Sequence, residues 1–75
     1  MTETEARAII MQRMERDADE EYPVPWVGDL IEETPEAFTF EATTHKENES
    51  PRDDYAHWFV YKDTGRTMPN IVLLQ

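Results

Sequence analysis

Apolar side chains recur every three or four positions in the first part of the chain, which is the spacing of one side of an α-helix. The stripe consists of Ala6, Ile9, Ile10, Met14 and Ala18. Thr2 and Glu5 have the spacing of a capping box, in which a hydroxyl and a carboxylate bind amides that a helix start leaves unpaired. The pattern predicts one amphipathic helix over residues 2–21.

An extended connector is predicted at residues 22–25, because Pro23 and Pro25 disfavour helical geometry at and before their own positions. Residues 26–33 alternate imperfectly between apolar and polar side chains and predict a first strand. Gly28 within it indicates a bulge or a close approach of another group to the backbone.

Residues 37–43 alternate cleanly, which is typical of a half-buried strand. Phe38, Phe40 and Ala42 share one side of this strand, and polar residues occupy the other. Residues 44–53 contain no apolar side chain and predict a mobile loop.

The densest aromatic segment is residues 54–66, which predicts a strand, a tight turn and the start of a return strand. Alternation puts Ala56, Trp58 and Val60 on one face of the strand, and Tyr55, His57, Phe59 and Tyr61 on the other. Gly65 suits the left-handed position of a bulged hairpin turn. Residues 66–74 complete a fourth strand, in which Pro69 favours an edge or a bulge.

These elements predict an α+β fold, with one N-terminal helix packed on a four-stranded antiparallel meander sheet. The 75 residues are expected to form a single domain. We expect the helix stripe to cover the face that carries Phe38 and Phe40. The other face is then left to solvent, to a second molecule or to the chain's own ends, so its aromatic residues belong either to the core or to an interface.

Composition narrows the possible partners. Seventeen acidic and seven basic residues give a net charge of −10, which should repel nucleic acid and anionic lipid and attract basic protein surfaces. A solubility device or adaptation to a salty cytoplasm would explain the same charge. There is no cysteine, and no apolar run approaches the ~20 residues of a membrane span, so we expect a cytoplasmic protein.

Candidate catalytic and metal-binding groups are sparse. His57 with Glu41, or His45 with Glu47 and Glu49, has the right donor types for a metal ion, but two histidines twelve residues apart do not predict a preset site. Adjacent carboxylates at segment ends lack the unlike environments that acid–base catalysis needs. We therefore predict no enzyme, no cofactor and no metal site.

Residues 57–67 (HWFVYKDTGRT), after a helix and a hairpin, resemble the strand-turn-strand of small bacterial immunity proteins of the YrhB-like type. The same strand-turn signature is similar to one in peptidase-propeptide (PepSY-type) inhibitory domains. The resemblance implies a cystatin-like helix-on-sheet unit and a non-enzymatic binder or inhibitor. Where YrhB-like proteins have an acidic-aromatic middle segment, this chain has a charged loop.

The hypothesis from sequence is an inhibitor or immunity-type protein that binds a basic partner, either a toxin or a nucleic-acid-handling effector. A phage anti-defence protein of the anti-CRISPR kind, acting as a nucleic-acid mimic, would have this size and charge. Acids that could share one end of the molecule, a geometry that the sequence leaves open, would steer the partner, and aromatics would anchor it. The candidates are Asp17, Asp19, Glu20, Glu21, Asp29, Glu32, Glu33, Glu36, Tyr55, Phe59 and Tyr61. The alternative is a structural homodimer formed through the exposed sheet face.

Overall fold

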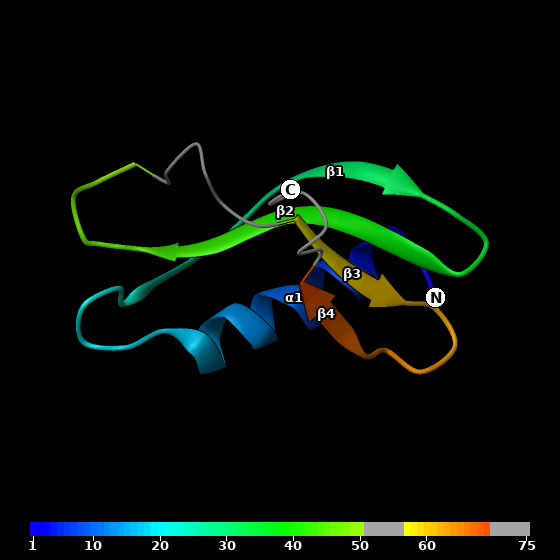
Figure 1. Ribbon diagram of the computed structural model, residues 1–75, viewed down its shortest axis with the longest axis horizontal. Helices are drawn as coiled ribbons and strands as arrows, with labels where there is room; N and C mark the ends of the chain where they lie inside the picture. The colour runs from blue at the N-terminus through cyan, green and yellow to red at the C-terminus, as the bar shows by residue number, and fades with distance from the viewer. Residues whose placement is uncertain (51–56, 70–75) are drawn as a thin grey trace.

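A computed structural model of the chain describes residues 1–50 and 57–69. Its elements are α1 (Glu3–Asp17), β1 (Val24–Glu33), β2 (Ala37–His45), β3 (His57–Tyr61) and β4 (Thr67–Pro69). The strands form one antiparallel sheet in the order β1-β2-β3-β4 (Figure 1). The predicted α+β fold, with an N-terminal helix packed on a meander sheet, is confirmed.

Helix α1 begins at the predicted capping box. The Glu5 amide donates to the Thr2 hydroxyl at 3.2 Å, and the Thr2 amide donates to the Glu5 carboxylate at 2.9 Å. These reciprocal bonds satisfy two amides that the first helical turn cannot pair internally. The pKa of the Glu5 carboxyl lies below its ordinary value of 4.5, chiefly because the carboxylate accepts the Thr2 backbone hydrogen bond.

The helix ends at Asp17, four residues before the predicted end, and Ala18 is extended. The cause is Asp19, whose carboxylate accepts hydrogen bonds from the amides of Glu21 at 3.0 Å and Tyr22 at 2.7 Å. An aspartate that binds nearby amides in this way offers the backbone a turn in place of another helical turn. Sequence periodicity does not reveal that competition.

The strand boundaries differ from the prediction at several ends. Strand β1 begins at Val24, so part of the predicted connector is strand, and Pro25 is tolerated because β1 is an edge strand. Strand β2 runs to His45, so the predicted loop loses its first two residues. Strand β4 ends at Pro69, also on an edge, and the rest of the predicted fourth strand lies outside the described residues.

The turn between β3 and β4 has the predicted bulged geometry. Gly65 has a φ of +71°, in the left-handed region that glycine enters without a steric penalty. Its amide donates to the Tyr61 carbonyl at 2.8 Å, and the Tyr61 amide donates to the Arg66 carbonyl at 2.9 Å. This turn sets the register in which Met68 lies opposite Phe59.

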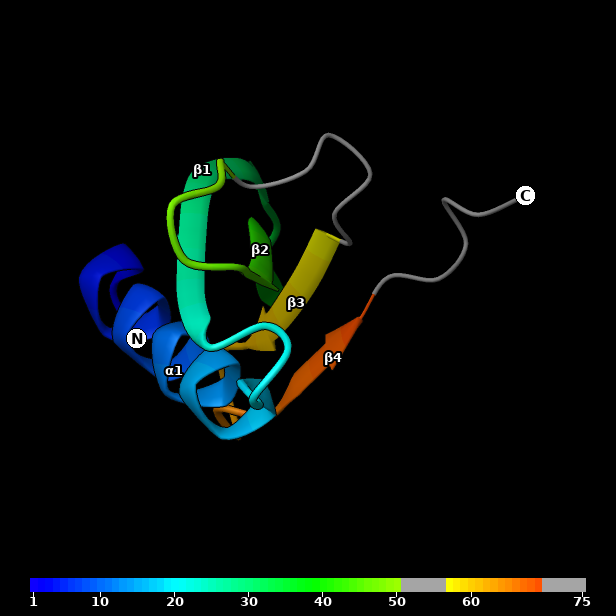
Figure 2. The same cartoon turned by 90° about the vertical axis from the view of Figure 1, so that its left-hand side faces the viewer.

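The core lies between α1 and one face of the sheet. Ala6, Ile10 and Met14 of the helix are buried and Ile9 packs against them, as predicted, whereas Ala18 of the predicted stripe lies beyond the end of the helix. The buried sheet residues packed against them are Phe38, Phe40, Ala42 and Val60. Figure 2 shows α1 on a single side of the sheet, and no described element covers the opposite side. Among the described residues, no helix combines the length and apolar character that crossing a membrane requires.

We predict that Glu5→Gln changes the pH dependence of stability. Because the pKa of Glu5 is lower in the folded chain, its contribution is present above the unfolded value and is lost as pH falls through the folded one. Glutamine still accepts the Thr2 hydrogen bond but does not titrate. Urea unfolding between pH 7 and pH 3 should show the natural chain losing stability more steeply than the variant.

Parallel pH curves for the two proteins would contradict the role of the ionised carboxylate. As a check on the cap itself, Thr2→Ala should lower the free energy of unfolding by about 1 kcal/mol at pH 7.

Candidate protein-binding surface

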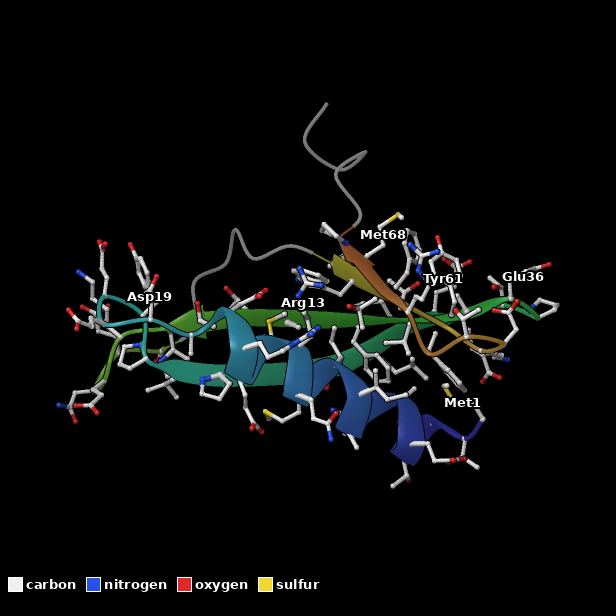
Figure 3. All side chains as sticks on the ribbon, turned by 90° about the horizontal axis from the view of Figure 1, so that it is seen from below. Met1, Arg13, Asp19, Glu36, Tyr61 and Met68 are labelled. Carbon is white, nitrogen blue, oxygen red and sulfur yellow. The ribbon has the colours of Figure 1, made fainter. Side chains whose placement is uncertain are left out.

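Six of the eight candidate acidic residues lie at two opposite ends of the molecule. Figure 3 places Asp19 at one end of the long axis and Glu36 at the other. The extended β1 separates the two groups, since ten residues of strand span about 33 Å. The structure therefore does not bring these acids together at one shared end.

One end, here the connector end, is formed by the segment between α1 and β1 together with the turn after β2. Pairing of Val24 with His45 brings these two segments side by side. Lys46 Nζ lies 5.7 Å from the centre of the Tyr22 ring and links them. The exposed carboxylates gathered at this end are Asp19, Glu20, Glu21, Glu47 and Glu49.

Two of the predicted acids lie outside both groups. Asp17 is on the last turn of α1, where its carboxylate pairs with Arg13 at 3.2 Å. Asp29 is exposed in a β-bulge of β1, between the paired residues Val27 and Leu30.

The opposite end, here the hairpin end, joins the β1–β2 and β3–β4 turns. The Lys62 amide donates to the Glu36 carbonyl at 2.9 Å, and Lys62 Nζ pairs with the Glu33 carboxylate at 2.7 Å. Within the described chain the carboxylates of Glu32, Glu36 and Asp63 make neither an ion pair nor a hydrogen bond. They are therefore available to an external basic group.

We call the side of the sheet opposite α1 the open face. Paired strand residues point to the same face, so the register assigns its side chains. They are Val24, Trp26, Glu32, Ala37, Thr39, Glu41, Thr43, His45, His57, Phe59, Tyr61 and Met68, of which Ala37 and Thr39 are buried. Glu32, Thr39, Phe59 and Met68 form one row across all four strands.

Tyr61 is the aromatic residue at the centre of the hairpin end. Its ring centroid lies 6.1 Å from that of Phe59, and its hydroxyl is 4.0 Å from Met68 Sδ. Hollows of about 430 and 310 Å³ flank it, one lined by Glu36 and Lys62 and the other by Met68, Asp63 and Arg66. Tyr61 is thus a half-buried aromatic ridge between two depressions, beside the unpaired carboxylates of the hairpin end (Figure 3).

Five of the predicted site residues come together at this end: Glu32, Glu33, Glu36, Phe59 and Tyr61. Tyr55 lies outside the described residues. Met68 and Asp63 belong to the same surface, although neither was predicted. Met68 is 48% exposed. The sequence could have revealed it, because a hairpin that turns at Gly65 pairs Phe59 with Met68 on the same face.

Trp26 lies on the open face across the backbone of Gly28. A β-carbon placed on Gly28 would come within 2.4 Å of Trp26 Cη2 and 2.9 Å of a Glu41 carboxylate oxygen. Those distances are far below van der Waals contact, so only glycine lets the indole ring lie flat here. The close approach predicted at Gly28 is confirmed, and β1 bulges next to it.

Four basic side chains lie over aromatic rings at the margin of the core. The distances to the ring centres are 5.0 Å for Arg7 over Phe40, 5.2 Å for Arg13 over Trp58, 4.7 Å for Lys62 over Phe38 and 5.7 Å for Lys46 over Tyr22. Such contacts hold a cation in place through the ring quadrupole. Arg7 and Arg13 are thereby kept at the seam between helix and sheet, away from the acids of both ends.

The two histidines considered for metal binding lie on different strands, His45 at the end of β2 and His57 at the start of β3. His57 pairs with Glu41 across β2 and β3, as the sequence allowed. Within residues 1–50 and 57–69, no group of three or more histidine, aspartate or glutamate side chains is arranged to hold a metal ion.

No protein-family model, curated protein or solved structure matches this chain. The surface itself therefore carries the functional argument.

We predict that Gly28→Ala displaces the Trp26 ring into solvent. Because the ring can swing away from the open face, the loss of stability should be small, about 1 kcal/mol. With Trp58→Phe in both proteins, Trp26 is the remaining indole, and its fluorescence emission should shift to longer wavelength in the Gly28→Ala variant. Ile31→Ala, at an exposed site on the same strand, is the control and should leave the emission unchanged. An unchanged spectrum in Gly28→Ala would contradict the close approach.

Proposed function

We propose that this chain is a small non-enzymatic inhibitor, of the immunity-protein kind, that binds a basic partner protein in the cytoplasm and blocks its working surface. The observation that carries the proposal is the hairpin end, where Tyr61 stands between two hollows beside carboxylates that have no partner within residues 1–50 and 57–69. The likeness of residues 57–67 to immunity and propeptide-type inhibitors points the same way.

The aromatic part of this surface supplies the anchor. Tyrosine is enriched among the few residues that contribute most of the free energy of binding, and these residues lie near the centre of an interface. Phe59 and Met68 extend the apolar area beside Tyr61. Side chains of this kind lose contact with water when a partner docks, which is the main favourable term in association.

The carboxylates supply direction and selectivity. A net charge of −10 accelerates encounters with a basic protein and opposes encounters with acidic ones. Glu32, Glu36 and Asp63 would meet arginine or lysine side chains of the partner around the aromatic anchor. A basic toxin and a nucleic-acid-handling effector both present such side chains.

The charge of this chain is too low for it to imitate a whole DNA duplex. A duplex as long as the 36 Å axis of this molecule carries about 21 phosphate charges, roughly twice the net charge of the chain. Acids concentrated at two ends favour blocking a local basic site over occupying a whole DNA-binding channel. A phage-encoded antagonist of host defence could act in this local way.

The second candidate is a homodimer formed by two open faces. The exposed Met68 beside Phe59 favours it, because together they extend the apolar area of that face. Sedimentation at micromolar concentration separates the candidates. A monomer supports the inhibitor proposal, and a stable dimer that Phe59→Ala dissociates supports the structural role.

The test of the inhibitor proposal is capture from extracts of the cells that encode the chain, followed by direct binding measurements with the purified partner. The captured protein should be basic, its activity should fall on binding, and its affinity should drop by at least tenfold between about 50 and 300 mM salt. Tyr61→Ala should weaken binding about thirtyfold, the loss expected from a 2 kcal/mol anchor.

Ile31→Ala is the matched control, since Ile31 is exposed on β1 and strand β2 lies between it and the strand that carries Tyr61, and it should bind as the natural chain does. An acidic partner, or equal effects of the two substitutions, would refute the proposal.

A further inference from the structure

An open groove of about 900 Å³ runs between the C-terminal half of α1 and the β3–β4 turn with the strand that follows it. Three arginines line it, Arg13 and Arg16 from the helix and Arg66 from the turn, while Glu15 is its one carboxylate. Three of the seven basic residues of a strongly acidic chain therefore converge on one site.

The groove has a fixed wall. Arg13 is held by the Trp58 ring at 5.2 Å, by the Asp17 carboxylate at 3.2 Å and by the Thr67 hydroxyl at 3.4 Å. On the opposite side, Gly65 brings the turn against the helix, because a β-carbon there would lie 3.5 Å from Ile9 Cδ1. Helix and turn are thus packed together at one end of the groove.

The other two arginines have no partner among the residues that the structure describes. Within the described chain, the guanidinium groups of Arg16 and Arg66 make no ion pair, hydrogen bond or ring contact. Carboxylates outnumber basic groups by 17 to 7, yet neither arginine pairs with Glu15 in the same groove. Two unpaired guanidinium groups thus line the same concave surface as the fixed Arg13.

We propose that this groove binds a short acidic peptide segment of a protein, a ligand opposite in charge to the partner surface proposed for the hairpin end. The planar guanidinium group binds carboxylates through paired hydrogen bonds, and Arg13, Arg16 and Arg66 would bind successive carboxylates of the segment. Nucleic acid fits less well, since its dense charge would extend beyond the groove toward the acidic ends of the molecule. A segment with two or three carboxylates would stay within the groove.

The test uses fluorescein-labelled triglutamate as the probe, with anisotropy read at about 20 mM salt. Binding should saturate. Arg16→Glu and Arg66→Glu should each weaken it at least about fivefold, because each loses one ion pair and gains a repulsion. Glu15→Gln should strengthen it by removing the carboxylate of the groove.

Lys46→Glu is the matched control, since it makes the same change in net charge at the connector end and should weaken binding less than twofold. All variants should keep the natural circular dichroism spectrum, because Arg16, Arg66 and Lys46 are exposed. Non-saturating binding would overturn the proposal, and so would equal losses in Arg16→Glu and Lys46→Glu. Arg66 also lines the hollow between Tyr61 and Met68, so Arg16→Glu is the variant that tests the groove alone. Either result leaves the hairpin-end proposal standing, because that proposal depends on Tyr61, Glu32, Glu36 and Asp63, which none of these variants changes.

Discussion

A single helix can shield only one side of this sheet, and the rest of the molecule follows from that constraint. Fifteen helical residues extend about 22 Å. The narrow apolar stripe of Ala6, Ile10 and Met14 packs against Phe38, Phe40 and their neighbours, so the helix has no buried side chain left for the other side of the sheet. Within the described residues no second helix covers the sheet. The open face must therefore be compatible with solvent or with a partner, which accounts for its mixture of threonine, glutamate and aromatic side chains.

The same packing sorts the charges. Arg7 lies over Phe40 and donates to the Gly28 carbonyl at 2.7 Å, while Arg13 lies over Trp58. These two arginines are thus held at the helix–sheet seam, Arg16 and Arg66 line the groove beside it, and most unpaired carboxylates lie at the two ends. A chain of net charge −10 becomes a molecule with acidic poles and a basic groove at its side. Such a surface can recognise a partner by orientation as well as by charge.

Much of the fold could be predicted from local pattern. The alternation of Phe38, Phe40 and Ala42 identified the face that the helix covers, and Gly65 identified the bulged turn. The end of α1 could not be predicted, because it depends on hydrogen bonds of the Asp19 carboxylate that compete with the helix. The two-ended arrangement of acids depends on the length of β1, and the arginine groove depends on where β4 lies beside α1. The arrangement of the acids and the groove both arise from tertiary structure, which the spacing of residues along the chain does not reveal.

The most direct test of the one-sided sheet is paramagnetic relaxation of side-chain NMR signals by a soluble, uncharged gadolinium chelate. The ring protons of Phe59 and Tyr61 should relax strongly, together with the Met68 methyl group, whereas those of Phe38 and Phe40 and the Val60 methyls should be protected. The contrast arises because α1 covers only the second group. Equal protection of Phe59 and Phe40 would mean that both sides of the sheet are covered, and would contradict the account.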